Sequence, residues 1–225
     1  MKQLIDFTFC GKHLVFGLDN VALLFIQIIG SSNHKGDEEE DYQIVKLAKG
    51  DDAKVAIHSV AITKISEGSK RDEYIHCAVG RSDKSLSMYQ FRLGTVCNSK
   101  DVTIQPCRVL TSNKRVSCMV YTSIEENLGD MRLAGTSEYC LLCADHAGDV
   151  VAYPLPPIHV EGEEESKSFT SNEHVSKLLL GHTASILTKI KIVRCGGSRK
   201  LLSSDRDEKI RISSFPNAFI LEGKV

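Results

Sequence analysis

Short runs of apolar or alternating residues recur along the whole chain. Clear examples cover residues 56–65, 116–123 and 186–193, and none keeps a helical period over three turns. Runs of this length, separated by polar and turn-forming residues, are typical of β-strands. The pattern therefore predicts an all-β protein built from many short strands.

One strand–turn–strand pattern occurs four times. It is clearest near the end of the chain, where a small-residue strand, an acidic turn and an alternating strand cover residues 201–213, and it also fits residues 14–25, 78–89 and 142–153. One strand position of this pattern is held in turn by Phe25, Tyr89, Tyr153 and Ser213, which lie 64, 64 and 60 residues apart. Such regular spacing indicates an internal structural repeat.

The fourth unit has the layout of a WD-type propeller blade, because Gly181 and His182 precede its strands in the way that this repeat requires. We therefore predict a WD40-type β-propeller with about four of an expected seven blades, approximately at residues 1–30, 53–93, 114–156 and 178–222. A propeller closes by pairing its last blade with its first. Four blades are expected to remain incomplete and unclosed, as the N-terminal part of a longer propeller, with the outer strand of the fourth at residues 217–221.

The repeat is degenerate. A regular WD blade contains a buried hydrogen-bond chain of His, Asp, Ser or Thr, and Trp, but this sequence has no tryptophan. We assign the structural hydrogen bonding of the fourth blade to His182, Asp207 and Ser203, with Ser213 in the position of Trp. The blades are then expected to depend on packing more than on this network.

Two acidic segments, residues 31–50 and 159–175, interrupt the repeat. Runs of like charge repel one another and stay solvated, so we expect flexible loops between blades. An acidic tail that binds a partner is the alternative.

Composition narrows the class of protein. The 225 residues carry a net charge of -1 and are 42% hydrophobic, which favours a globular domain without a global field that would attract nucleic acid or an acidic membrane. The longest apolar run, residues 21–29, is too short to cross a bilayer. Asp6 interrupts the stretch that a signal peptide would need, and no Asn-x-Ser/Thr acceptor occurs, so we expect an intracellular protein with no membrane partner.

The sequence offers little catalytic or metal-binding chemistry. Of eight cysteines only Cys140 and Cys143 form a C-x-x-C pair, and a strand would place these two on opposite faces. We expect buried thiols, no metal and no cofactor. The chain also lacks a phosphate-binding loop, a dinucleotide fingerprint and a Gly-x-Ser-x-Gly elbow, so we do not expect an enzyme.

The turn at residues 205–209, Asp-Arg-Asp-Glu-Lys, carries both signs of charge. In the strand that follows, Arg211 and Ser213 alternate with Ile210 and Ile212, which predicts an exposed polar face and a buried apolar face. An exposed cation on a rigid strand is a good interface anchor. In the alternative interpretation, a carboxylate of the same turn neutralises Arg211, and such surface pairs contribute only about 0–1 kcal/mol.

The fourth unit resembles the non-catalytic WD-repeat subunit of the tRNA (guanine-N7)-methyltransferase. The resemblance rests on residues 179–188 and 204–213, above all the string Asp-Arg-Asp-Glu-Lys-Ile-Arg, and on Ala-Asp-x-x-Gly-Asp-Val at residues 144–150. It is strong over about 45 residues, moderate over the third unit and weak before residue 50.

The resemblance implies a scaffold that forms a heterodimer with a separate catalytic subunit in the nucleus, with the cytoplasm as a second compartment. That partner would bind S-adenosylmethionine and methylate a guanosine in the tRNA variable loop. It also implies that a cation at Arg211 pairs with an acidic side chain of the catalytic subunit, with Lys209 and Arg206 as neighbours in the same interface.

Two other functions stay open. Direct RNA binding needs clustered cations, and the fourth unit offers Lys189, Lys191, Arg194, Arg199 and Lys200. The near-neutral chain with 6% aromatic residues makes such a contact with tRNA auxiliary. A generic WD40 scaffold in another nuclear complex would share the fold and differ only in its partner.

Overall fold

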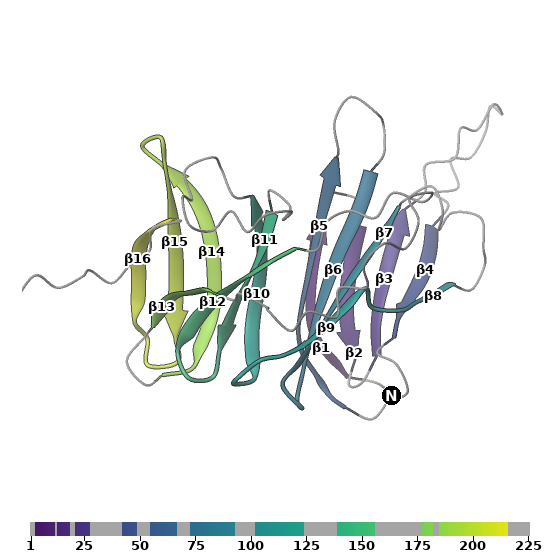
Figure 1. Ribbon diagram of the computed structural model, residues 1–225, viewed down its shortest axis with the longest axis horizontal. Coiled ribbons are helices and arrows are strands. Elements are labelled where there is room, and N and C mark those ends of the chain that lie inside the picture. The colour runs from purple at the N-terminus through teal and green to yellow at the C-terminus, as the bar shows by residue number, and fades with distance from the viewer. Residues whose placement is uncertain are drawn as a thin grey trace, which may run out of the picture. The chain divides into compact units, whose positions relative to one another are not determined.

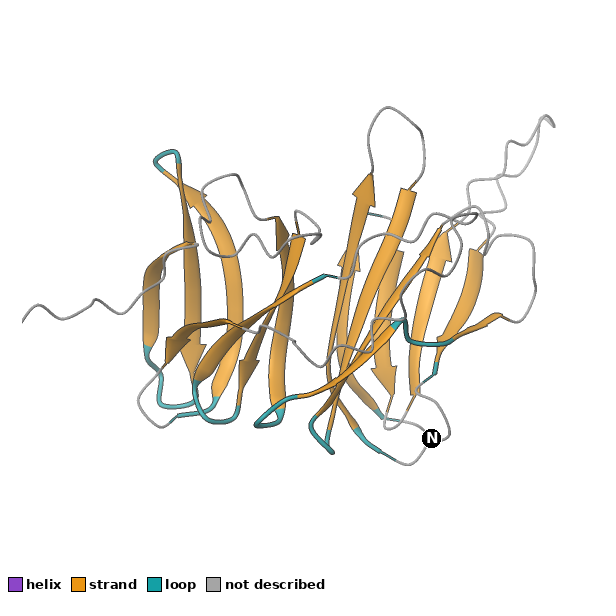
Figure 2. Ribbon diagram, viewed as in Figure 1, coloured by secondary structure: helices purple, strands orange, loops and turns teal. Residues whose placement is uncertain are grey.

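The computed structural model describes residues 3–11, 13–18, 21–27, 42–48, 55–66, 73–92, 102–123, 139–155, 177–181 and 185–215. The chain divides into two compact units, Met1–Val116 and Ser117–Val225, each of which contains two β-sheets (Figure 1). The described part contains strands and turns but no helix (Figure 2), and therefore none that could span a membrane. The predicted all-β class and WD40-type fold are confirmed, and the described strands form four sheets.

The first unit holds two sheets. In the first sheet four antiparallel strands lie in chain order and a short fifth pairs in parallel with the fourth: β1 (Leu4–Cys10), β2 (His13–Leu18), β3 (Val21–Gln27), β4 (Tyr42–Leu47) and β8 (Val102–Ile104). The second sheet contains β5 (Ile57–Ser66), β6 (Glu73–Arg81), β7 (Ser85–Arg92) and β9 (Arg108–Thr111), all antiparallel.

These two sheets pack face to face around a shared apolar core that includes Val15, Ala22, Cys77 and Val79. Gly17 allows the close approach, because a Cβ there would lie 2.7 Å from Cγ2 of Ile57. Polar contact also joins the sheets, since Oδ2 of Asp6 accepts the backbone N–H of Val60 at 2.9 Å.

The second unit repeats this arrangement. Its third sheet contains β10 (Val116–Ser123), β11 (Tyr139–Asp145), β12 (Asp149–Pro154) and β13 (Lys177–Gly181). The fourth sheet contains β14 (Leu187–Cys195), β15 (Ser198–Asp205) and β16 (Ile210–Phe215). The core between them includes Cys140, Leu142, Leu201 and Phe215.

The strand boundaries differ from the predicted units in the outer strands. Residues 42–47, predicted as part of the loop 31–50, form β4, and Lys177–Gly181, predicted to open the fourth blade, is the last strand of the third sheet. Strands β4 and β13 each follow a long connection in the sequence. Their membership in a sheet therefore depends on pairing with distant strands and not on the local sequence pattern. The loop at 159–175 and the strand predicted at 217–221 lie outside the described residues.

Candidate functional site

The charged turn between β15 and β16, residues 206–209, is organised by the carboxylate of Asp205. Oδ1 of Asp205 accepts the backbone N–H groups of Asp207 at 2.9 Å and of Lys209 at 3.0 Å. The backbone N–H of Asp205 donates to the carbonyl oxygen of Lys209 at 3.0 Å, and that of Arg206 donates to Ile186 at 2.9 Å. Because its backbone is fixed at these points, the turn presents its side chains from a rigid support.

The same turn is built in other sheets. In the third sheet Oδ1 of Asp145 accepts the N–H groups of Ala147 at 2.7 Å and of Asp149 at 3.0 Å. One residue of each turn has a positive φ, at Lys84 (67°), Gly148 (96°) and Glu208 (63°). These shared contacts support the repeat that the sequence predicts.

Four side chains of the turn, Arg206, Asp207, Glu208 and Lys209, are exposed to solvent. Two of the three predicted partner-binding cations, Arg206 and Lys209, are therefore accessible. Both signs of charge remain next to each other in the turn, as the sequence suggests.

Arg211 lies differently from the prediction. It pairs across the sheet with Ser203, which is buried, and its side chain is half-buried. Ile210 and Ile212, predicted to be buried, are 74% and 66% exposed. The alternation in β16 was predicted correctly but the choice of covered face was wrong, because the third sheet covers the face that carries Ser203 and Leu201.

Arg211 is not a free cation, since it already takes part in an interaction within the chain. This observation keeps open the alternative in which its charge is balanced internally. Its predicted role in partner binding remains a prediction.

The residues predicted to form the structural hydrogen bonds of the fourth blade, His182, Asp207 and Ser203, differ in how they lie. The buried carboxylate in this turn is Asp205, whereas Asp207 is exposed and contributes its backbone N–H. Ser203 is buried and has an interaction partner. His182 lies outside the described residues, so its pairing with Asp207 remains a prediction.

Arg199, one of the candidate RNA-binding cations, is used for packing inside the second unit. Its guanidinium donates to the carbonyl oxygen of Ser123 at 2.5 Å and to Oγ1 of Thr122, and it lies 4.9 Å from the ring centroid of Phe215. Sequence reasoning missed this role, because a charged residue in an alternating strand resembles a surface cation.

The other candidate cations remain closer to solvent. Lys189, Lys191 and Arg194 are exposed along β14, and Lys200 is half-buried with Nζ 3.1 Å from Oγ of Ser214. Lys189 and Lys191 lie two residues apart on the same face of the strand. Within the described residues, Lys189 and Lys191 thus form a short cationic row that a polyanion could approach.

The cysteine pair of β11 is buried, as predicted. Burial raises the pKa of the Cys140 thiol to about 12 and also raises the pKa of Cys143, so both favour the protonated form. Among the described residues no group of three potential metal ligands occurs. The C-x-x-C motif therefore behaves as part of the core.

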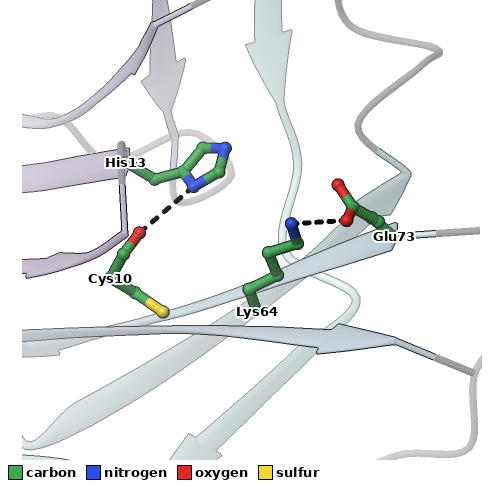
Figure 3. Close-up of polar contacts among 4 residues, drawn as sticks. All are labelled: Cys10, His13, Lys64 and Glu73. Atoms are coloured by element: carbon green, nitrogen blue, oxygen red, sulfur yellow. Dashed lines mark hydrogen bonds and ion pairs between the residues drawn. The ribbon is translucent and has the colours of Figure 1, made fainter.

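Two further polar contacts lie near each other in the first unit (Figure 3). Nδ1 of His13 is 3.2 Å from the carbonyl oxygen of Cys10, and Nζ of Lys64 pairs with Oε1 of Glu73 at 2.5 Å. Burial lowers the pKa of His13, which favours its neutral form. These contacts fasten strand ends and leave the charged turn as the stronger functional candidate.

The charged turn lies in the part of the chain that matches a family model. Residues 158–224 match the family model described as the tRNA methyltransferase TRM82 WD40 domain. The resemblance to this family is confirmed. The matched segment includes the whole of β14, β15 and β16 together with the turn at 206–209.

Two relatives extend the likeness. The chain is 31% identical over 146 residues to the tRNA (guanine-N(7)-)-methyltransferase non-catalytic subunit wdr4 of Dictyostelium discoideum, a match that covers 63% of this chain and 26% of the relative. It is 26% identical over 152 residues to the corresponding subunit TRM82 of Debaryomyces hansenii, covering 68% of this chain and 28% of that protein. The chain thus spans about a quarter of each relative's length. Both relatives are named as non-catalytic, in agreement with the expectation that this chain is not an enzyme.

Among solved structures, the extracellular domains 1-2 of Drosophila Semaphorin 1a superpose with a TM-score of 0.56 at 11% identity, covering 95% of this chain and 56% of that one. At this identity the likeness concerns the fold alone.

Proposed function

We propose that this chain is a non-catalytic scaffold that binds and stabilises the catalytic subunit of a tRNA (guanine-N7)-methyltransferase and so supports methylation of the tRNA variable loop. The observation that carries the proposal is the family match over residues 158–224, which contains the charged turn. S-adenosylmethionine would be bound by the partner subunit and not by this chain.

The geometry of the turn suits this role. Asp205 fixes the backbone from Arg206 to Lys209, so little order has to be created when a partner binds. Arg206 and Lys209 are exposed, and each can form a charge-assisted hydrogen bond with a carboxylate of the partner. Arg211 is the second residue of β16, the strand that follows the turn. It completes the proposed docking surface, defined here as Arg206, Lys209 and Arg211.

Co-purification with the catalytic subunit from the same organism tests the proposal. We expect Arg206→Glu and Lys209→Glu to weaken the complex and Arg211→Glu to abolish it, because each reverses a charge at the docking surface. Lys84→Glu is a matched control, since Lys84 is an exposed cation in the equivalent turn of the second sheet. Equal recovery of the partner by all four variants and the unchanged chain would remove this turn from the interface.

Arg211→Glu needs a separate test of folding, because Arg211 is half-buried and already interacts within the chain. We expect its circular dichroism spectrum and thermal unfolding to stay close to those of the unchanged chain. If the variant unfolds, the two exposed positions, Arg206 and Lys209, still decide the proposal.

We further propose that contact with tRNA is auxiliary and that the complex acts in the nucleus, with the cytoplasm as a second compartment. Filter binding of the isolated chain at several salt concentrations should give little binding without the catalytic subunit. Pull-down followed by mass spectrometry identifies the partner directly. Recovery of an unrelated complex in place of a methyltransferase would support a generic WD40 scaffold instead.

A further inference from the structure

One end of the second sheet gathers cations from two separate segments of the first unit. The turn between β6 and β7, residues 82–84, supplies Lys84, and the connection from β9 to β10, residues 112–115, supplies Lys114 and Arg115. All three residues are exposed to solvent. We call this group the cationic end of the second sheet.

Ser112 holds the two segments together. Its backbone N–H donates to the carbonyl oxygen of Lys84 at 2.9 Å. Its Oγ lies 3.2 Å from the same carbonyl oxygen and also within hydrogen-bond distance of the carbonyl oxygen of Lys114. Because Ser112 is buried, these contacts are shielded from water. The backbones that carry Lys84 and Lys114 are thus fixed next to each other, so little order has to be created when a ligand binds both side chains.

The cationic end carries an excess of positive charge. Asp83 is the one acid among residues 82–84 and 112–115. Its Oδ1 accepts the backbone N–H of Ser85 at 2.9 Å, so this carboxylate is engaged by its own turn. The charged turn of the fourth sheet, residues 206–209, has two cations and two acids instead. The second sheet therefore presents a net positive surface, which attracts anions, where the fourth presents a balanced one.

This group lies at strand ends and not on a face of the sheet. Sheets of a propeller pack on one another through their faces, so strand ends stay accessible to a ligand from outside. The other cationic row, Lys189 and Lys191, lies on a face of the fourth sheet, in the same cross-strand rows as Ile210 and Ile212. The cationic end of the second sheet is therefore the better candidate for an anion-binding surface.

The residues of the two segments favour a phosphate backbone over a protein as the ligand. Both segments lack apolar residues, and Val116, which follows the second, is 1% exposed. The centre of a protein interface is usually apolar and rich in aromatic residues. Phosphate groups are instead contacted by lysine, arginine and asparagine side chains, and Asn113 is exposed beside Lys114 and Arg115.

We propose that the cationic end of the second sheet binds the phosphate backbone of tRNA within the methyltransferase complex. This inference rests on the proposed function, in which the complex takes tRNA as its substrate, and it names the surface that makes the auxiliary contact. Three cations neutralise at most three phosphates, which is too few for tight binding by the isolated chain. The contact adds to the affinity of the complex for tRNA and does not read its base sequence.

The test is filter binding of an unmodified tRNA transcript to the complex of this chain with the catalytic subunit, at several salt concentrations. The first variant combines Lys84→Gln, Lys114→Gln and Arg115→Gln. We expect it to recover the catalytic subunit fully and to bind tRNA about tenfold more weakly at low salt. The slope of log K against log salt concentration should become shallower by about 2–3, because up to three phosphate contacts no longer release counterions.

The matched control removes the same number of charges from β14 by combining Lys189→Gln, Lys191→Gln and Arg194→Gln, all at exposed positions. It should bind tRNA with the affinity and the salt dependence of the unchanged complex. An equal loss in both variants would mean that only the net charge of the chain matters, which overturns the inference.

Lys84→Glu alone supplies a milder variant. It serves above as a control for recovery of the catalytic subunit, and in the filter-binding assay it should weaken tRNA binding in the same direction as the first variant. Circular dichroism and thermal unfolding check the fold, which these exposed positions should not disturb. If the first variant unfolds, Lys84→Glu still decides the inference.

The outcomes separate this inference from the proposed function. A first variant that recovers the catalytic subunit and binds tRNA as the unchanged complex does would overturn the inference and leave the proposed function standing. A folded first variant that loses the catalytic subunit would make the cationic end a protein-docking surface and overturn the inference as well. If the unchanged chain does not recover the catalytic subunit, the proposed function fails and this inference fails with it.

Discussion

Asp205 holds Lys209 from two sides: its Oδ1 accepts the N–H of Lys209 at 3.0 Å, and its own N–H donates to the carbonyl oxygen of Lys209 at 3.0 Å. The carboxylate is buried whereas the ammonium-bearing side chain of Lys209 is exposed. A buried acid thus fixes the backbone that carries an exposed cation. The docking surface should therefore depend on a residue that does not itself touch the partner.

Asp205→Ala is expected to lower the free energy of unfolding by about 1–3 kcal/mol, because two backbone N–H groups lose a charged acceptor. It should also weaken binding of the catalytic subunit although no cation is removed. Urea denaturation and co-purification measure the two effects. Asp207→Ala is the matched control and should change stability by no more than about 0.5 kcal/mol, since this carboxylate is exposed. If Asp207→Ala lowers the free energy of unfolding as much as Asp205→Ala does, the side chain of Asp207 has a structural role, as the sequence predicted.

Glu208→Gly should stabilise the chain by about 0.5–1 kcal/mol. Glu208 has a φ of 63°, a conformation that costs a residue with a Cβ but suits glycine. Thermal unfolding checks this, with Lys84→Gly expected to behave alike at its φ of 67° and Gly148→Ala expected to destabilise the third turn. A lower melting temperature for Glu208→Gly would mean that its side chain makes a contact that outweighs the strain.

The strands and turns of this protein were predictable because their signals are local. The alternation from Ile210 to Phe215 and the acidic turn before it indicate a strand–turn–strand unit without reference to any other part of the chain. Strand β4 was missed because it follows an acidic run and pairs with β3 only across a long connection.

The faces of the strands were not predictable in the same way. Alternation separates Ile210 from Arg211, but which of the two is covered depends on a neighbouring sheet that the local sequence does not describe. The packing role of Arg199 could not be predicted for the same reason, since its partners Thr122 and Ser123 lie more than seventy residues earlier in the chain. The sequence therefore locates the candidate residues along the chain, in the turn and at the start of β16, but their exposure had to come from the structure.

Arg199→Met should destabilise the second unit by about 1–3 kcal/mol. The change removes the donors to Ser123 and Thr122 and the cation above the ring of Phe215. Lysine cannot reproduce the planar fork, so Arg199→Lys should recover only part of the loss. Urea denaturation measures both, with Lys191→Met as a control at an exposed position of β14. If Arg199→Met is as stable as the control, Arg199 is a surface cation after all and returns to the RNA-binding candidates.

Acid should destabilise the first unit through His76. Burial lowers the pKa of this side chain from 6.5 to about 4, so between these values the unfolded chain binds a proton that the folded chain does not. Stability is then complete above pH 6.5 and falls as the pH drops toward 4, by on the order of 3 kcal/mol. In His76→Gln this contribution is absent, and a plot of unfolding free energy against pH should be flatter between pH 6.5 and 4.5. Carboxylates that titrate near pH 4 act alike in both chains, so the difference between the two plots isolates His76. Parallel plots would mean that His76 is protonated in the folded state, and its burial would then need an acidic partner.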